Sequence, residues 1–289
     1  MINFLKYKTV YFLISTVVIL SGIFSIYYYG YNVSIDFAGG TNIAYQFNKK
    51  IAKTDIEPIF KNKKIKIFSI SITGSNRLHA RTSSIDEKQE KQIRDEAEKK
   101  LNAKIQLLLF ETVGPTLGRE TIIKTIIASL VASLGILLYL TFAFKNLKYG
   151  LAAIIAAIHD LLVLFGTFSL ISHFLGAELD LLFVTAILTT MSFSVHDTIV
   201  VFDKIREYRK KEWKSDFKTI ANRAVTETMV RSLNNSLTII LMLVALVLIG
   251  GEVIRFFVLT LLIGTITGTY SSPFVAVPIL ELLERRKSS

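Results

Sequence analysis

The stretch from Leu181 to Phe202 reads LLFVTAILTTMSFSVHDTIVVF, and it decides which kind of protein this is. A helix of this length crosses the hydrocarbon core of a bilayer, which takes about 20 mostly apolar residues. His196 and Asp197 nevertheless lie inside the run. Ionisable side chains at membrane depth are costly and usually face a bundle interior or a water-filled path. The stretch therefore predicts a transmembrane helix that carries a functional site.

Apolar runs of similar length recur along the 289 residues, of which 51% are hydrophobic. A soluble protein with one core is excluded, and we expect an α-helical polytopic membrane protein. The first run follows Lys6 and Lys8 and ends in tyrosines without a small-residue cleavage pattern, so a retained helix is favoured over a signal peptide. The six expected helices cover residues 9–29, 122–144, 151–175, 181–202, 229–249 and 256–280.

Lysine and arginine in the short loops predict the orientation. With both termini inside, the inner segments hold sixteen basic residues and the short outer loops hold only Arg255. The count covers residues 1–8, the turn at Lys145 and Lys148, the stretch from Lys204 to Arg231 that includes an expected loop over 204–228, and a tail over 283–289. We therefore expect a multi-pass protein with cytoplasmic termini, residues 120–282 as helices 2 to 6, and an external block.

That external block, residues 32–119 after the segment 1–31, alternates between strand and helix patterns. Strand-like alternation over 42–47, 66–73, 77–82 and 104–110 is interrupted by a helix start at 54–58 and by helix formers over 86–101. The order strand, helix, strand, strand, helix, strand predicts an α+β ferredoxin-like domain. In the loop over 204–228, apolar residues from Phe217 to Val225 recur at helical spacing, and we expect a short helix at the membrane surface.

Several kinds of chemistry lack sequence support. Without cysteine there is no disulfide or thiolate metal site, and no GxxxxGK[ST], HExxH or GxSxG motif occurs. We therefore expect no enzyme activity, cofactor or metal. The net charge of +11 lies mainly in loops beside apolar runs, which favours an orientation signal and contact with anionic lipids over nucleic-acid binding.

Four ionisable residues lie within the expected third and fourth spans: His159, Asp160, His196 and Asp197. By helical rise, Asp160 lies near the midplane. Asp197 and Arg231 of the fifth span lie at similar depths, so the two would pair if their helices adjoin.

Polar rows accompany these groups on the same helices. Thr190, Ser194 and Asp197 share one face of the fourth span, beside a second row that includes Thr185, Thr189, Ser192 and His196. Interhelical hydrogen bonding explains the hydroxyls, but it explains Asp197 less well because a carboxylate costs more than a hydroxyl. Gly264 and Gly268 in the sixth span have GxxxG spacing and predict close packing, and the following Ser-Ser-Pro predicts a broken helix.

Taken together, these motifs resemble the SecF family of the bacterial Sec protein-export machinery, the smaller partner of SecD and a relative of the RND transporters. The stretch after the first span that contains Asp36, Phe37, Gly39 and Gly40 is similar to a family junction motif. Also similar are Gly114-Pro115 before the second span, His159-Asp160, Asp197-Thr198 and Arg231-Ser232. One departure is His196, where the family usually has asparagine.

The resemblance implies an RND-like bundle in the inner membrane with its domain, 32–119, in the periplasm. It implies a partnership with SecD, the SecYEG channel, YajC and YidC, and use of the proton-motive force to help draw preproteins out. Asp197 and Arg231 match the family's proposed proton path, and His196, Asp160 and His159 are further candidates. Because His196 is a second titratable group beside Asp197, the identity of the coupling ion stays open. The alternatives are a half-size RND-like exporter of small molecules, disfavoured by the small external domain, and a scaffold without ion flux.

Overall fold

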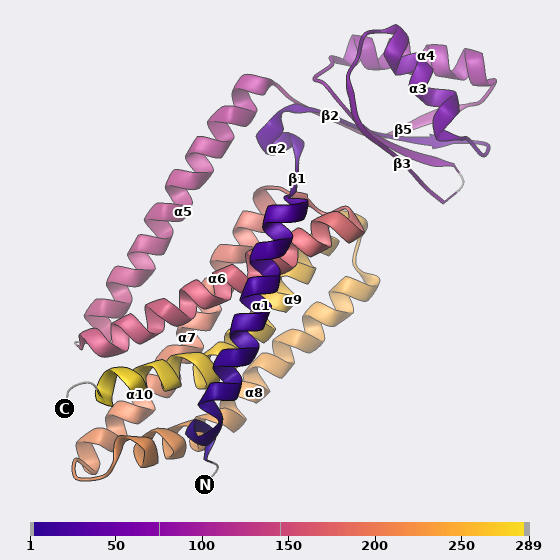
Figure 1. The fold of residues 1–289 in the computed structure, drawn as a ribbon. Coiled ribbons are helices and arrows are strands. Elements are labelled where there is room, and N and C mark those ends of the chain that lie inside the picture. Colours follow the sequence, from indigo (N-terminus) through magenta and orange to yellow (C-terminus); the bar gives the residue numbers. More distant parts are fainter. Residues whose placement is uncertain (1–2, 75, 145, 286–289) are drawn as a thin grey trace. The chain divides into compact units, whose positions relative to one another are not determined.

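The computed structural model describes residues 3–74, 76–144 and 146–285 (Figure 1). The chain divides into two compact units, Met1–Asn32 with Ile127–Ser289 and Val33–Ile126. The larger unit is helical and the smaller unit contains the main sheet. Residues 286–289 of the predicted tail and Lys145 of the predicted inner turn lie outside the described residues.

The described residues include six helical segments that are long and apolar enough to cross a membrane, as the sequence predicts. The first is α1 (Lys8–Tyr29), which follows the 3-10 turn η1 (Phe4–Tyr7). The second is α5 (Pro115–Phe144). The others are α6 (Leu147–Leu175), α7 (Leu181–Lys211), α8 (Phe217–Ile249), and α9 (Glu252–Ser271) continued by α10 (Val277–Arg285).

The connection between α7 and α8 is shorter than the sequence predicted. α7 continues to Lys211 and α8 begins at Phe217, so the expected loop over 204–228 is reduced to residues 212–216. The stretch from Phe217 to Val225 is helical as expected, but it forms the first turns of the long helix α8. Charged side chains join the two helix ends: Lys204 lies 3.2 Å from Glu227, and Arg223 lies 2.7 Å from Glu212.

The sixth span is irregular at its Ser-Pro sequence but continues as a helix, so the predicted break is not found. α9 ends at Ser271, a π-helical turn η2 (Ser272–Ala276) follows, and α10 begins at Val277. Pro273 has no backbone N–H to continue the α-helical pattern. Single π turns inside α-helices occur frequently at functional sites, and this one carries Ser272 into the interior of the bundle.

Glycines set the closest helix contacts in the larger unit. A Cβ added at Gly22 of α1 would lie 2.9 Å from the Cα of Gly166 of α6, and one added at Gly268 of α9 would lie 2.8 Å from the Cβ of Ser194 of α7. A Cβ at Gly264 would overlap the side chain of Thr190. The expected close packing at the GxxxG pair is confirmed, and its partner is α7.

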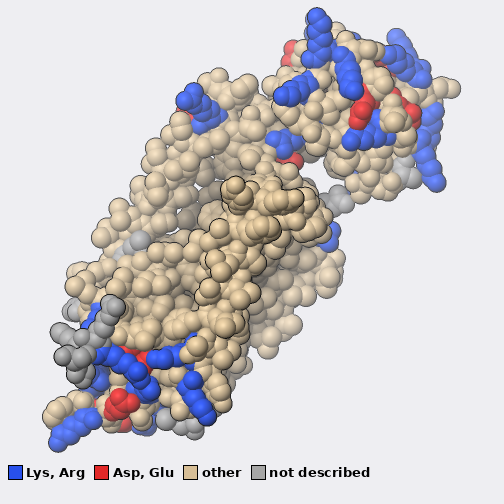
Figure 2. Space-filling model, in the orientation of Figure 1, with Lys and Arg blue, Asp and Glu red and all other residues tan. Residues whose placement is uncertain are grey.

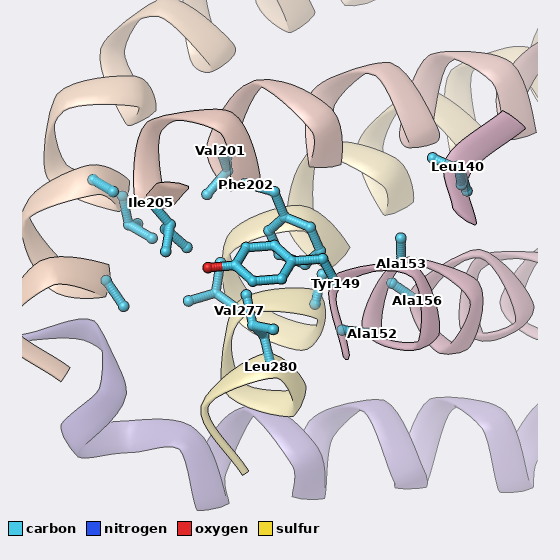
Figure 3. Close-up of a cluster of buried hydrophobic side chains, with 14 of the residues drawn as sticks. Leu140, Tyr149, Ala152, Ala153, Ala156, Val201, Phe202, Ile205, Val277 and Leu280 are labelled. Atoms are coloured by element: carbon cyan, nitrogen blue, oxygen red, sulfur yellow. The ribbon is translucent and has the colours of Figure 1, made fainter. Parts of the chain in front are cut away.

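Near η2 the larger unit has an aromatic and aliphatic core (Figure 3). The rings of Tyr149 and Phe202 meet edge to face, with centroids 5.4 Å apart at 86°. Small side chains of α6, including Ala153 and Ala156, are buried in the same cluster. On the visible face of this unit, Lys, Arg, Asp and Glu gather at one end, and an uncharged band covers its middle (Figure 2).

In the smaller unit, four antiparallel strands lie in the order β3-β4-β2-β5. They are β2 (Gly40–Phe47), β3 (Ile67–Thr73), β4 (Arg77–Thr82) and β5 (Ile105–Val113). Helices α3 (Lys53–Asn62) and α4 (Glu87–Leu101) cover one face, and buried side chains such as Tyr45, Phe60 and Ile93 fill the layer between. The short elements are α2 (Ile35–Ala38), β1 (Asn32–Val33) and β6 (Glu178–Leu179).

The junction motif packs against the exit motif within the smaller unit. A Cβ at Gly39 would lie 2.9 Å from the Cα of Pro115, and one at Gly118 would lie 2.9 Å from the backbone oxygen of Phe37. Gly39 and Gly40 also have φ angles of +70° and +127°, which disfavour other residues. The motif glycines therefore serve close backbone packing where α2 meets the start of α5.

Candidate functional site: two buried carboxylates in the helical unit

Asp160 of α6 is buried, and both of its carboxylate oxygens have hydrogen-bond partners. Its Oδ2 accepts a hydrogen bond from the hydroxyl of Ser271 at 2.7 Å and another from Ser194 of α7. Its Oδ1 lies 2.8 Å from Nδ1 of His159. The glycine contacts bring α9 close enough to α7 for both hydroxyls to reach one oxygen. Three helices thus converge on this carboxylate.

His159, adjacent in sequence, is also buried and extends the cluster to a fourth helix. Its Nε2 lies 3.0 Å from Oγ of Ser15 on α1. Its ring is inclined to that of Tyr270, with centroids 6.4 Å apart. Both ring nitrogens have polar partners, so the imidazole can hold one proton or two without leaving a nitrogen unpartnered.

Asp197 of α7 is buried but has fewer partners. Its Oδ1 accepts a hydrogen bond from the hydroxyl of Ser232 on α8, and its Oδ2 makes no hydrogen bond within the described residues. The neighbouring Thr198 hydroxyl lies 3.0 Å from that of Ser272 in η2. A buried carboxylate with an open acceptor position is suited to take up a proton or a cation.

A hydroxyl chain continues from this second carboxylate. Ser232 is followed one turn later by Ser236, whose Oγ bonds to the backbone oxygen of Ser232. Thr269 of α9 donates to Ser236 at 2.7 Å. Hydroxyl groups both donate and accept, and Ser232, Ser236 and Thr269 join α7, α8 and α9 by polar contacts.

Arg231 and His196 lie apart from these buried groups. Arg231 is exposed, and among the described ion pairs it has no carboxylate partner. The residue after Arg231 is Ser232, which lies on the buried face of α8 and donates a hydrogen bond to Asp197. His196 is exposed on the other face of α7 and lines an open groove of about 680 Å³ with Thr185, Thr189 and Ser192. The roles of Arg231 and His196 in ion coupling stay predictions.

The predicted first row on α7 lies inside the bundle. Thr190, Ser194 and Asp197 are all buried, and a cavity of about 10 Å³ beside Asp160 is lined by Thr190, Ser194 and Gly264. Such a volume corresponds to about one water molecule. No group of three or more His, Cys, Asp or Glu side chains suited to a metal ion occurs within the described residues.

Sequence reasoning missed the part played by Ser15. Serines are common in apolar helices, so one hydroxyl carries little signal. A signal does exist, because the small residues Ser15, Gly22 and Ser25 are spaced to share a face of α1, and the structure buries all three. Ser232 stood within a quoted motif, but its contact with Asp197 was not expected.

A family model described as protein export membrane protein SecD/SecF, C-terminal, matches residues 93–286. The protein translocase subunit SecF of Thermobaculum terrenum is 38% identical, with 99% of this chain and 95% of that protein covered. The SecF subunit of Anaerolinea thermophila is 36% identical, with 98% and 94% covered.

Solved structures agree with these relatives. The crystal structure of SecDF, a translocon-associated membrane protein from Thermus thermophilus, is similar with a TM-score of 0.85 at 28% identity. The match covers 99% of this chain and 39% of that longer chain. A SecDF structure in a super-membrane-facing form gives a TM-score of 0.70 with the same coverage. The half-size exporter of small molecules is not favoured, and the chain belongs to the SecF family of protein translocase subunits within the SecD/SecF export membrane proteins.

Proposed function

We propose that this chain works with SecD in the inner membrane and uses the proton gradient to help draw preproteins out of the SecYEG channel. The observation that carries the proposal is Asp197, a buried carboxylate with one bonded oxygen and one oxygen without a partner in the described residues. The relatives named SecF and the likeness to SecDF support a role in protein export for the chain that carries this carboxylate.

The physical basis is charge movement across the membrane potential. Moving one elementary charge across 100 mV yields about 2.3 kcal/mol, which is enough to bias a two-state movement if a group can load and release that charge. Asp197 can load a proton at its open oxygen. Asp160, by contrast, already has both oxygens bonded, which favours a supporting or relay role together with His159.

The external unit would supply the contact with exported chains. Its strand order and its two helices on one sheet face support the ferredoxin-like assignment. We propose that residues 32–119 face the periplasm and touch emerging polypeptide or partner domains. YajC and YidC are proposed neighbours in the assembly, and the basic inner loops would contact anionic lipids.

The decisive experiment measures preprotein translocation into inverted vesicles that contain the chain together with SecD. Export is compared with the gradient intact and after a protonophore, and Asp197→Asn is compared with wild type in verified complexes. The mutant is expected to assemble and to lose the gradient-dependent part of export, because a neutral amide cannot load and release a proton.

The matched control is Asp203→Asn, which makes the same change six residues later on α7 at an exposed side chain. This control should keep gradient stimulation. Replacing the protonophore by collapse of an imposed sodium gradient distinguishes the two ions: sensitivity only to the sodium gradient would assign a sodium-coupled site. Full gradient-stimulated export by Asp197→Asn would show that the carboxylate is structural and would refute the proposal.

A further inference from the structure

Helices α1 and α6 run parallel with a constant sequence offset. Ser15 meets His159, Gly22 meets Gly166, and Ser25 meets Ser169, and the residues of each pair are 144 positions apart. The spacings of seven and three are those of helices packed at a shallow crossing angle. Each residue of α1 in this row therefore meets one fixed residue of α6.

The three contacts differ in their chemistry. The glycine pair is purely steric. Ser25 donates a hydrogen bond to the hydroxyl of Ser169 at 3.0 Å, and Ser169 donates to the backbone oxygen of Gly30. Only the Ser15 contact continues to a carboxylate, through His159 Nε2 at 3.0 Å and then Nδ1 to Asp160 Oδ1 at 2.8 Å. Ser15 is thus the one member of this row that is linked by hydrogen bonds to a buried carboxylate, that of Asp160.

A serine hydroxyl is suited to both proton states of this imidazole. When Nδ1 carries the proton toward Asp160, Nε2 is an acceptor and Ser15 donates to it. When the ring is doubly protonated, Nε2 donates and Ser15 accepts by rotating its hydroxyl. An alanine at position 15 would leave a buried ring nitrogen without this partner in either state.

We infer that Ser15 is a positioning residue that couples the buried His159–Asp160 pair, the proposed relay, to α1, the helix that continues past Gly30 into the smaller unit. This inference rests on the proposed ion-coupled function. α5, the other helix that connects the two units along the chain, makes no hydrogen bond to Asp160 or Asp197 within the described residues. On this proposal, a change in the charge of the His159–Asp160 pair acts on α1 through Ser15.

The test uses the full chain with SecD in inverted vesicles and compares Ser15→Ala, Ser15→Thr and Ser25→Ala with Asp197→Asn. Ser15→Ala is expected to assemble but to lose most of the gradient stimulation of export, at least several-fold. Ser15→Thr keeps a hydroxyl and is expected to restore it. Ser25→Ala removes a buried serine of the same helix pair that does not lead to a carboxylate, and it should retain stimulation.

A second readout does not depend on export. The chain has four histidines, so nitrogen-15 spectra of histidine-labelled protein can be assigned, with His159→Gln identifying the signals of position 159. Ser15→Ala is expected to shift the two His159 nitrogen signals, while Ser15→Thr and Ser25→Ala leave them near their wild-type positions.

The outcomes separate the two claims. Full stimulation in Ser15→Ala, equal loss in Ser15→Ala and Ser25→Ala, or unshifted His159 signals would each overturn the role of Ser15. If Asp197→Asn keeps stimulation while Ser15→Ala loses it, the assignment of the loading residue fails and the role of Ser15 stands. If the wild type shows no gradient stimulation, both claims fail.

Discussion

The hydroxyl of Ser232 on α8 donates a hydrogen bond to the carboxylate of Asp197 on α7. Its neighbour Arg231, which lies at a similar depth, is exposed. Successive residues of a helix point about 100° apart, so only one of the two can face α7. The helices adjoin as the depth estimate required, but the partner that reaches the buried carboxylate is the serine.

Ser232→Ala is expected to lower the thermal stability of the purified chain, because it removes the hydrogen bond to Oδ1 of Asp197. Hydrogen bonds to charged groups contribute about 1.5–3 kcal/mol, and neutral ones about 1 kcal/mol. Unfolding in detergent measures the change. Thr238→Ala is the control, since this exposed hydroxyl bonds only to the backbone of its own helix. Equal stability of both variants would show that the Ser232 contact contributes nothing.

Gly22→Ala is expected to destabilise the bundle by about 1–3 kcal/mol, the usual effect of overpacking. The added Cβ would meet backbone of α6 at 2.9 Å, so the two helices would have to separate. The control is Gly135→Ala in α5, where an added Cβ meets nothing within 4 Å and a higher helix propensity should leave stability unchanged or raised. A Gly22→Ala protein as stable as Gly135→Ala would contradict the close crossing.

Burial of Tyr45, together with the nearby carboxylate of Glu90, raises the pKa of its phenol. Because the folded-state pKa lies above the unfolded value of about 10, this group stabilises the smaller unit fully below about pH 10. That contribution is lost as the pH rises further. The tyrosinate absorbance of wild type minus that of Tyr45→Phe should therefore appear only above about pH 10. A difference signal that titrates at or below the ordinary phenol range would refute this burial effect.

Both termini and the connector between α7 and α8 are predicted to face the cytoplasm, from the distribution of lysine and arginine. Since the chain has no cysteine, single cysteines can be introduced at Ser215 and Ser288 without background. An impermeant thiol reagent should label them in inverted vesicles and spare them in intact cells, whereas a cysteine at Glu87 in α4 should show the reverse. Labelling of Ser215→Cys from outside intact cells would show that the topology is the opposite of the predicted one.

Local patterns in the sequence determined the kind of structure. Six apolar runs predicted six long helices, because the period of apolar residues and their number per run depend only on neighbouring positions. Alternation along 42–47 and 66–73 predicted the strands of the sheet for the same reason. The pattern failed at residues 204–228, where charged residues marked a loop, although ion pairs between the ends of α7 and α8 keep both helices extended.

The buried position of Asp160 and Asp197 was also predictable, since a carboxylate in an apolar run needs polar partners in the bundle interior. Tertiary packing alone decided which groups are those partners. The approach of α9 to α7 at Gly268 lets Ser271 reach Asp160, and the parallel register of α1 on α6 places Ser15 on His159. The Ser271–Asp160 and Ser15–His159 contacts join residues 111 and 144 positions apart, and their geometry depends on how whole helices meet. A linear sequence records each hydroxyl without recording the helix that it will face.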